Sequence, residues 1–349
     1  SFKGLKAQYV TIPDANFAAW LNNYYPNCMI GNQMDTTCSE VVNMFGVYLI
    51  SEGVSDLTGI QYLDSLKELK INFNPITSLP NLPKTLVKLD CASNDLASLP
   101  ALPNTLVTLN CNGNQLTSLP TLPDSLSYLY CNSNTLNGLP SLPNSLLELN
   151  CSGVNLSALN SLPINLIEFI CVSCQITTLP ALPNSLEYLS CGSNSLTSLP
   201  NLPNSLSLLH CNNNQLISLP NLPNSLVNIW CNNNQLINLP TLPNQLTHLS
   251  CSYNQLTSLP EIPNTILLFV IDSNNINCLP LLPDKNYNSF SISGNQITCV
   301  PNYINAMDSA TLALPLCQDN DIVNNPNGCS STAGISGHTY FDLNQNCLH

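Results

Sequence analysis

The sequence predicts a mainly β repeat solenoid, a fold in which short parallel strands stack side by side along the chain. The first observation is a phrase of 20 residues that recurs ten times between residues 79 and 278. Two neighbouring copies read LPNLPNSLSLLHCNNNQLIS (199–218) and LPNLPNSLVNIWCNNNQLIN (219–238). A single copy is too small to bury its own apolar residues, so each copy must stack on its neighbours.

The second observation is the pattern inside each copy. Leu209 and Cys211 are apolar two residues apart, which is the spacing of side chains on one face of a strand. We therefore expect a short strand that turns leucine and cysteine inward and leaves its other residues in water. Pro200 and Pro203 remove two backbone donors and favour an extended, polyproline-like return without a helix. Because such a return is thin, we expect an open and gently curved ribbon.

The third observation is an asparagine between the strand and the return. Its side-chain amide can donate and accept hydrogen bonds, so it can satisfy turn backbone groups inside the stack. In two copies Val154 and Cys174 stand in its place, and the segment 151–178 should therefore be the first part of the array to open. The asparagine itself stands at positions 94, 114, 134, 194, 214, 234, 254 and 274.

The repeated phrase resembles the short bacterial leucine-rich repeat, LPxLPxxLxxLxxxxNxLxx, over 200 of the 349 residues. The resemblance implies a leucine-rich repeat ribbon with a parallel concave sheet and an extended, polyproline-like convex side. It leaves function open, because the same scaffold carries many unrelated binding surfaces. Secreted effectors with ubiquitin-ligase tails use this repeat too, but no stretch of this sequence resembles that tail.

The chain before the array predicts a small helical cap. Phe17, Trp20, Leu21 and Tyr24 recur at helical spacing, and Asp14 can cap the helix. We expect this amphipathic helix to cover the first coil. The resulting division is an N-terminal cap (1–43), the solenoid (44–299), a C-terminal cap (300–332), and a linker with the start of a following β-sandwich (333–349).

The two flanks carry a second resemblance. The opening IPDANFAAWL and the closing cap are similar to segments that flank leucine-rich repeats in cell-surface proteins of Bacteroidetes-type bacteria. The final ISGHTYFDLNQNC resembles the first strand of a SdrD-type or Cna-B-type sandwich. These resemblances imply an exported, modular protein at the bacterial surface, associated with the outer membrane, of which this chain is a fragment.

Apart from Cys174, the seventeen cysteines divide into a ladder of nine and a group of seven near the ends of the stack, which includes Cys347. Nine of them, from Cys91 to Cys251 at steps of 20, hold the inward strand position. Matching residues of stacked strands lie ~4.8 Å apart with parallel side chains, whereas disulfides need Cβ atoms ~3.8 Å apart and facing each other. We therefore predict buried thiols that act as small hydrophobes. A metal wire or a ladder of disulfides is disfavoured because nine is odd and no histidine or carboxylate should point inward beside them.

The second group of cysteines lies near the ends of the stack, where the open core and strand edges need caps. Cys28 and Cys38 close a loop of ten residues in the N-terminal cap, and we expect a disulfide between them. Such disulfides indicate an oxidising, extracellular compartment. The C-terminal candidates, whose pairing stays open, are Cys278, Cys299, Cys317 and Cys329.

The charge balance excludes two classes of partner. The chain has 20 acidic residues against seven lysines, no arginine and a formal net charge of -13. Six of the lysines lie before residue 89, so the array itself is almost without cations. Nucleic acids and anionic membrane surfaces both require basic patches. No apolar run approaches the ~18 residues of a membrane span, so we expect no direct membrane insertion.

The water-facing residues beside each central strand leucine form the expected concave face, where leucine-rich repeat proteins usually bind. From Tyr188 onward this face becomes aromatic, and an indole on a solvent-facing sheet is uncommon in a monomer. Aromatic side chains are enriched at interface hot spots, although cross-strand packing that shields the sheet explains them equally well. The candidate ligand-binding residues are Tyr128, Tyr130, Tyr188, His210, Trp230, His248 and Tyr253.

The sequence predicts neither an enzyme nor a cofactor. His210 and His248 stand two coils apart, roughly 10 Å by strand spacing, as solvated histidines without an adjacent carboxylate. A hydrolase triad needs three groups in mutual hydrogen-bond reach. No metal site is predicted, since two calcium-like motifs are incomplete and one has Cys347 where the loop glycine belongs. The oxygen ligands of these motifs would be Asp319, Asp321, Asp342, Asn344 and Asn346.

We therefore expect a non-enzymatic recognition module, secreted or at the cell surface, that binds a protein or glycan through the concave face. One alternative is a structural spacer or assembly subunit that contacts neighbouring subunits of a larger surface complex. Another is a host-directed effector domain. Paired cap cysteines would argue against the effector, because disulfides do not persist in a reducing cytosol.

Overall fold

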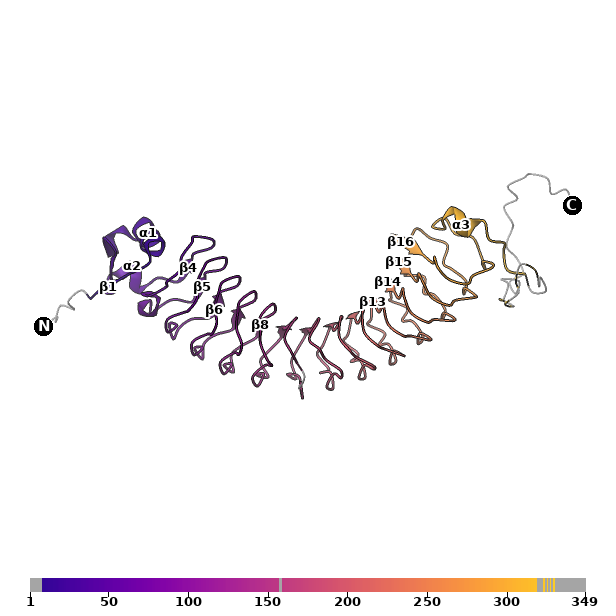
Figure 1. The fold of residues 1–349 in the computed structure, drawn as a ribbon, viewed down its shortest axis with the longest axis horizontal. Helices are drawn as coiled ribbons and strands as arrows, with labels where there is room; N and C mark the ends of the chain where they lie inside the picture. Colours follow the sequence, from indigo (N-terminus) through magenta and orange to yellow (C-terminus); the bar gives the residue numbers. More distant parts are fainter. Residues whose placement is uncertain are drawn as a thin grey trace. The chain divides into compact units, whose positions relative to one another are not determined.

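The computed structural model describes residues 8–156 and 159–318, together with the single positions 323, 325, 327 and 329. The chain divides into two compact units, Ser1–Leu216 and Ile217–His349, and each is considered by itself. Figure 1 shows that both consist of short strands joined by loops, with few helices. Thirteen parallel strands, β4 to β16, confirm the predicted mainly β repeat solenoid.

The N-terminal cap of the first unit contains the predicted helix, α1 (Ala15–Tyr24). One carboxylate oxygen of Asp14 accepts hydrogen bonds from the backbone N–H groups of Asn16 and Phe17, at 2.9 Å each. The other accepts from the N–H and hydroxyl of Ser55 in the first coil, at 2.8 and 2.9 Å. Asp14 therefore starts the helix and also fastens it to the solenoid.

The same cap contains a small antiparallel sheet that the sequence analysis missed. Its strands pair in the order β1, β3, β2. Strands of two or three residues are too short to show an alternating pattern, and this explains the omission. The cap elements other than α1 are β1 (Tyr9–Thr11), η1 (Pro26–Cys28), β2 (Met29–Ile30), β3 (Gln33–Asp35) and α2 (Ser39–Val42).

The repeat strands of the first unit each have three residues, and they lie side by side (Figure 1). The middle residue is buried and its two neighbours face outward, as expected. Leu129, for example, lies in register between Leu109 and Leu149. The elements are β4 (Gly46–Tyr48), η2 (Ile60–Tyr62), β5 (Glu68–Lys70), β6 (Lys88–Asp90), β7 (Thr108–Asn110), β8 (Tyr128–Tyr130), β9 (Glu148–Asn150), β10 (Glu168–Ile170), β11 (Tyr188–Ser190) and β12 (Leu208–His210).

The second unit continues the same pattern and ends it. Phe269 of β15 pairs in register with Phe290 of β16, a step of 21 residues where the strands from β5 to β15 repeat every 20. A short helix, α3, follows in the C-terminal part of the unit. The elements are β13 (Asn228–Trp230), β14 (His248–Ser250), β15 (Leu268–Val270), β16 (Ser289–Ser291) and α3 (Ser309–Leu312).

The repeated asparagines link consecutive coils, as predicted. The side-chain amide of Asn114 donates to the carbonyl oxygens of Cys111 in its own coil (3.1 Å) and Cys91 in the preceding coil (3.0 Å). Its oxygen accepts a hydrogen bond from the N–H of Leu96 at 3.0 Å. One buried side chain thus satisfies backbone groups of two coils, which would otherwise be unpaired inside the stack.

The two exceptions to this asparagine ladder behave differently. The thiol of Cys174 donates to the carbonyl oxygens of Cys151 (3.2 Å) and Val172 (3.5 Å), so a small, weakly polar side chain does occupy the asparagine position. Val154 is fully buried and apolar, so it has no amide to offer. At the Cys174 position, the N–H of Leu156, which an asparagine oxygen would accept elsewhere in the ladder, donates to the backbone carbonyl of Cys174 at 3.0 Å. The ladder is therefore partly replaced at Cys174 and broken at Val154.

The cysteines sort as the sequence analysis expected. Ten buried thiols line the array, the nine ladder positions and Cys174. Burial raises the pKa of the Cys191 thiol to about 12, so it stays protonated and inert at neutral pH. Cys28 is bonded to Cys38. The C-terminal pairing, which the sequence left open, joins Cys278 to Cys329 and Cys299 to Cys317.

Several sequence-based expectations concern the C-terminal end of the chain and possible membrane spans. The expected following β-sandwich (333–349) and the limits of the C-terminal cap remain predictions. None of the helices within the described residues is long and apolar enough to cross a membrane. The calcium candidates Asp319, Asp321, Asp342, Asn344 and Asn346 lie outside the described residues.

Candidate functional site

The first and third residues of each repeat strand form one outward surface, which we call the strand face. Because successive side chains of a strand point to opposite sides, these two residues lie on the same side while the middle one is buried. On β8, Tyr128 and Tyr130 are half-buried and Leu129 is fully buried. The strand face therefore carries the only strand residues that change from coil to coil without disturbing the interior.

A hollow of about 330 Å³ opens on the strand face of the first unit. Its middle strand, β7, contributes Thr108 and Asn110, while the longer Lys88 on β6 and the two tyrosines on β8 stand on either side. Two tyrosine rings stand on one side, and a lysine and a carboxylate stand on the other. The residues lining this β6–β8 hollow are Lys88, Asp90, Thr108, Asn110, Tyr128 and Tyr130.

In the wall of the hollow, the side chain of Tyr130 is fixed by a residue of the next strand. The hydroxyl of Tyr130 donates a hydrogen bond to the carboxylate of Glu148 on β9. Burial and this hydrogen bond raise the pKa of Tyr130, so the hydroxyl remains a donor across the physiological range. Burial and the neighbouring Glu148 also raise the pKa of Glu168 on β10. The hollow is thus flanked by a pair of carboxylates on adjacent strands.

Tyr188 and His210 come together on β11 and β12. The Tyr188 hydroxyl lies 3.2 Å from Nδ1 of His210, and the two rings meet edge to face with centroids 5.3 Å apart. Burial lowers the pKa of His210 and favours the neutral imidazole. The expectation of a solvated histidine is therefore wrong for His210, because its ring packs across the strands against Tyr188.

The second unit carries the indole that the sequence analysis singled out. Trp230 ends β13 and is 41% exposed. Nδ1 of His248 lies 2.7 Å from the hydroxyl oxygen of Thr247. Tyr253 is 61% exposed and has φ 56°, at a turn position that serine and asparagine occupy in neighbouring coils. Bulky side chains rarely adopt this left-handed conformation.

The candidate binding residues therefore fall into three groups. Tyr128 and Tyr130 line the hollow, Tyr188 and His210 pack on each other, and Trp230, His248 and Tyr253 belong to the second unit. Nδ1 of His210 lies near a tyrosine hydroxyl, and Nδ1 of His248 lies near a threonine hydroxyl.

Sequence reasoning missed the four other residues of the hollow, Lys88, Asp90, Thr108 and Asn110. It weighted aromatic residues and so placed the centre of the face at the indole. The useful signal was the size of the side chains on successive strands. Thr108 and Asn110 on β7 lie between the long Lys88 on β6 and the two tyrosines on β8, and this difference in length contributes to the hollow.

Known structures with the same fold are bacterial leucine-rich repeat proteins. YopM from Yersinia enterocolitica WA-314 is 33% identical, with a TM-score of 0.66 over 70% of this chain and 59% of that chain. YopM described as a leucine-rich effector protein from Yersinia pestis is 29% identical, with a TM-score of 0.62 over 73% of this chain and 78% of that chain.

A third likeness concerns the fold alone. The functional domain of InlJ from Listeria monocytogenes, which includes a cysteine ladder, is 23% identical, with a TM-score of 0.68 over 84% of this chain and 73% of that chain. No protein-family model and no curated protein sequence matches the chain. It spans 59% of the length of the first YopM. The 20-residue repeat and the parallel strands form a leucine-rich repeat solenoid of the bacterial type, similar to the two YopM structures.

Proposed function

We propose that the protein is a non-enzymatic recognition module that binds a protein or a glycan through the strand face. The observation that carries the proposal is the β6–β8 hollow, which combines two tyrosine rings with side chains that donate and side chains that accept hydrogen bonds. Lys88 donates, Asp90 accepts, and Asn110 can do both. This set of groups is what a polar ligand with one flat face needs for orientation.

The size of the hollow limits what it can hold. At about 330 Å³ it lies at the lower end of the range of ligand pockets, so it suits one sugar ring or one protruding side chain. Its position on an open sheet leaves the ligand in contact with water. Catalysis usually requires a site that excludes water, so the open geometry favours reversible binding over a reaction.

The second unit offers a separate anchor. An exposed tryptophan on a strand is the residue type most enriched at binding hot spots. Tyr253 exposes an aromatic ring at a strained turn position of the same unit. Removal of the Trp230 indole should therefore weaken binding of a ligand that reaches this unit, without loss of stability.

The test is a glycan and protein array followed by titration of the ligands found. Tyr128→Ala should reduce affinity by about thirty-fold or more, since hot-spot truncations typically cost at least ~2 kcal/mol. Thr108 lines the hollow and therefore cannot serve as a neutral control. Thr117→Ala is the matched control, because Thr117 is exposed in the same unit outside the strand face. Equal affinities of the two variants would refute binding at the hollow.

For the location we propose an exported protein at the bacterial surface, associated with the outer membrane. The disulfides in both caps support an oxidising compartment. The likeness to YopM supports the alternative of a host-directed effector, because one of those structures is described as an effector. Disulfide mapping of protein taken from its native source separates the two, since reduced caps there would contradict the surface location.

A further role as spacer or assembly subunit follows if the strand face binds nothing. A spacer needs only the interior of the coils, so it does not require a hollow or an exposed indole. In the array experiment a spacer gives no ligand above background for wild-type protein. That result would also remove the basis for the proposed recognition at the surface.

A further inference from the structure

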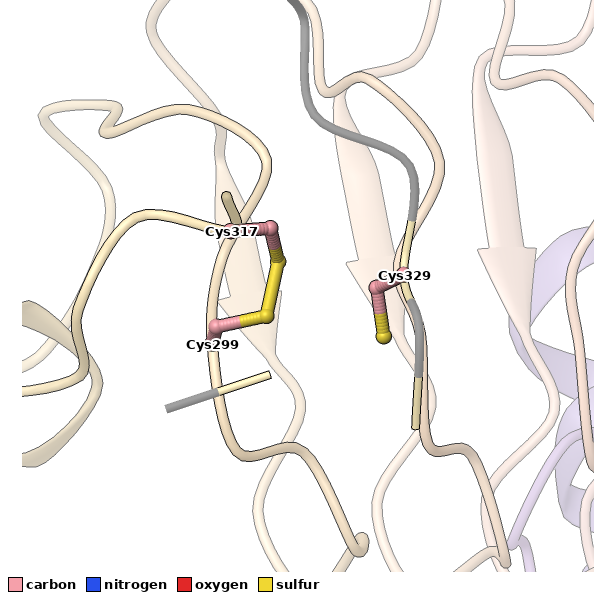
Figure 2. Close-up of side chains that lie close together, drawn as sticks. All are labelled: Cys299, Cys317 and Cys329. Atoms are coloured by element: carbon pink, nitrogen blue, oxygen red, sulfur yellow. A yellow bond between two sulfur atoms is a disulfide. The ribbon is translucent and has the colours of Figure 1, made fainter. Parts of the chain in front are cut away.

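The C-terminal part of the second unit gathers four cysteines in one place. The sulfur atoms of Cys299, Cys317 and Cys329 all lie within 4.8 Å of one another, and Cys278 is bonded to Cys329. Figure 2 shows the Cys299–Cys317 disulfide with the Cys329 side chain beside it. Within the described part of the chain, this is the one group of three or more cysteine, histidine or acidic side chains close enough to share an ion.

We propose that this cysteine cluster becomes a tetrathiolate zinc site when both disulfides are reduced, with Cys278, Cys299, Cys317 and Cys329 as the four ligands. Structural zinc sites are tetrahedral with Zn–S bonds of about 2.3 Å, which places the sulfur atoms about 3.8 Å apart. The sulfur atoms of Cys299, Cys317 and Cys329 already lie within 4.8 Å of one another, and the Cys278 sulfur is bonded to that of Cys329 at 2.08 Å. After the S–S bonds open, rotation of the four side chains brings them to the corners of a tetrahedron.

The surroundings of the cluster suit a closed structural site. Cys299 is fully buried, Cys317 and Cys329 are 5% and 3% exposed, and Cys278 is half-buried, so three of the four proposed ligands are shielded from water. Asn325 is buried beside them, with its oxygen 3.6 Å from the Cys299 sulfur and 2.7 Å from the Cys329 backbone nitrogen, which donates to it. Its amide donates to the Cys329 carbonyl at 2.7 Å. Asn325 therefore fixes the backbone of Cys329, one of the proposed ligands, independently of the S–S bonds.

The conversion balances with a reductant of the dithiol class. Each of two dithiol molecules gives two electrons and two protons to one protein disulfide, breaks its S–S bond and closes into a cyclic disulfide. The four resulting protein thiols release four protons to solvent as Zn²⁺ binds their thiolates. In an oxidising compartment the reverse holds, since disulfide formation removes the thiolates that zinc needs. The same four residues can thus stabilise the cap by disulfides in an oxidising compartment and by zinc in a reducing one.

The other disulfide provides an internal comparison. Cys28 and Cys38 also yield two buried or half-buried thiols on reduction, but two sulfur ligands do not complete a tetrahedral site. Zinc should therefore distinguish the two ends of the chain, although both carry disulfides when oxidised.

The experiment uses the full chain, reduced with a phosphine that does not compete for zinc and then exchanged into oxygen-free buffer. Zinc is added with a chromophoric chelator as competitor, and reactive thiols are alkylated under native conditions and mapped by mass spectrometry. The expected result is one tightly bound zinc per chain and zinc-dependent protection of the four cluster cysteines, while Cys28 and Cys38 are alkylated. Absence of stoichiometric zinc, or protection of other cysteines instead, would overturn the proposal.

Matched variants make the result specific. The double variant Cys299→Ser and Cys329→Ser should lose stoichiometric zinc, whereas Cys28→Ser and Cys38→Ser should keep it. Oxidised wild-type protein, in which the cap is intact, should take up no zinc, and this comparison does not depend on whether a variant folds. Zinc uptake by the oxidised protein, or equal loss in both double variants, would show that the ion binds elsewhere.

Discussion

The interior of the coils and the strand face differ in how far the sequence repeats. Inside, leucine, cysteine and asparagine return every 20 residues, because each coil packs against a coil of the same shape. On the strand face the residues change at each step, from Thr108 and Asn110 to Tyr128 and Tyr130 within one coil. We therefore expect stability to depend on the repeating half of the coil, and the proposed recognition to depend on the half that varies.

The sharpest contrast should come from one substitution on each side. Leu209→Ala removes a fully buried side chain and should cost about 2–5 kcal/mol. Asn228→Ala on the strand face should change stability by less than ~0.5 kcal/mol, because its amide oxygen is buried without a hydrogen-bond partner among the described residues. Urea denaturation of both variants measures the difference. Equal destabilisation would mean that the inward and outward faces are assigned backwards.

The asparagine ladder should rank second. Asn114→Ala leaves buried carbonyl and N–H groups of two coils unpaired and should cost about 1–3 kcal/mol. Asn112 is the control, since it is the same residue type two positions earlier and its side chain lies outside the ladder. A shift of the urea midpoint as small as that of Asn112→Ala would show that the ladder does not hold the coils together.

Coils with and without the ladder asparagine can be compared with each other in one protein. Val154 has no amide, and the N–H of Leu156 relies on a backbone carbonyl where that of Leu96 has the Asn114 oxygen. In native-state hydrogen exchange, amides of 151–178 should therefore exchange faster than the equivalent amides of 91–118. Slower exchange in 151–178 would contradict a structural role for the asparagine.

A small effect is expected from the carboxylates beside the hollow. Burial and Glu148 raise the pKa of Glu168, so the folded state holds its proton more tightly than the unfolded state. The stability from this group is present below its ordinary pKa of 4.5 and is lost as pH rises through the raised value. Glu168→Gln should therefore stabilise the protein at neutral pH by at most ~0.5 kcal/mol, because the side chain is partly exposed and screened.

The Glu168 effect has its own check. In a Glu148→Gln background the gain from Glu168→Gln should shrink, since one source of the raised pKa is gone. Thermal melts at neutral and acidic pH report both changes. A loss of stability at neutral pH in Glu168→Gln would show that the charged form is favoured in the folded state.

Most of the fold was predictable because the same physical demand recurs in every coil. The inward Leu209, the linking asparagines and the thiol ladder all follow from the 20-residue period. The N-terminal sheet β1–β3 and the C-terminal disulfide pairing were not predictable, since they are formed once, by short segments whose partners are distant in sequence. The repeat therefore makes the coils predictable from the sequence, whereas the caps, which do not repeat, are not.

The candidate site was predictable only in part. The outward position of Tyr128, Tyr130 and Trp230 follows from strand alternation. The hollow does not, because it depends on relative side-chain lengths across three strands. The contact between Tyr188 and His210 depends on rotamers that no periodicity specifies.

Binding by the strand face can be tested directly by titration of four proteins. Wild-type protein, Tyr128→Ala, Trp230→Ala and the exposed off-face variant Ile237→Ala are titrated with each ligand that the array identifies. The account predicts that Ile237→Ala binds like wild type, while at least one strand-face variant loses about thirty-fold in affinity at an unchanged melting temperature. Identical affinities for all four proteins would contradict recognition through the strand face.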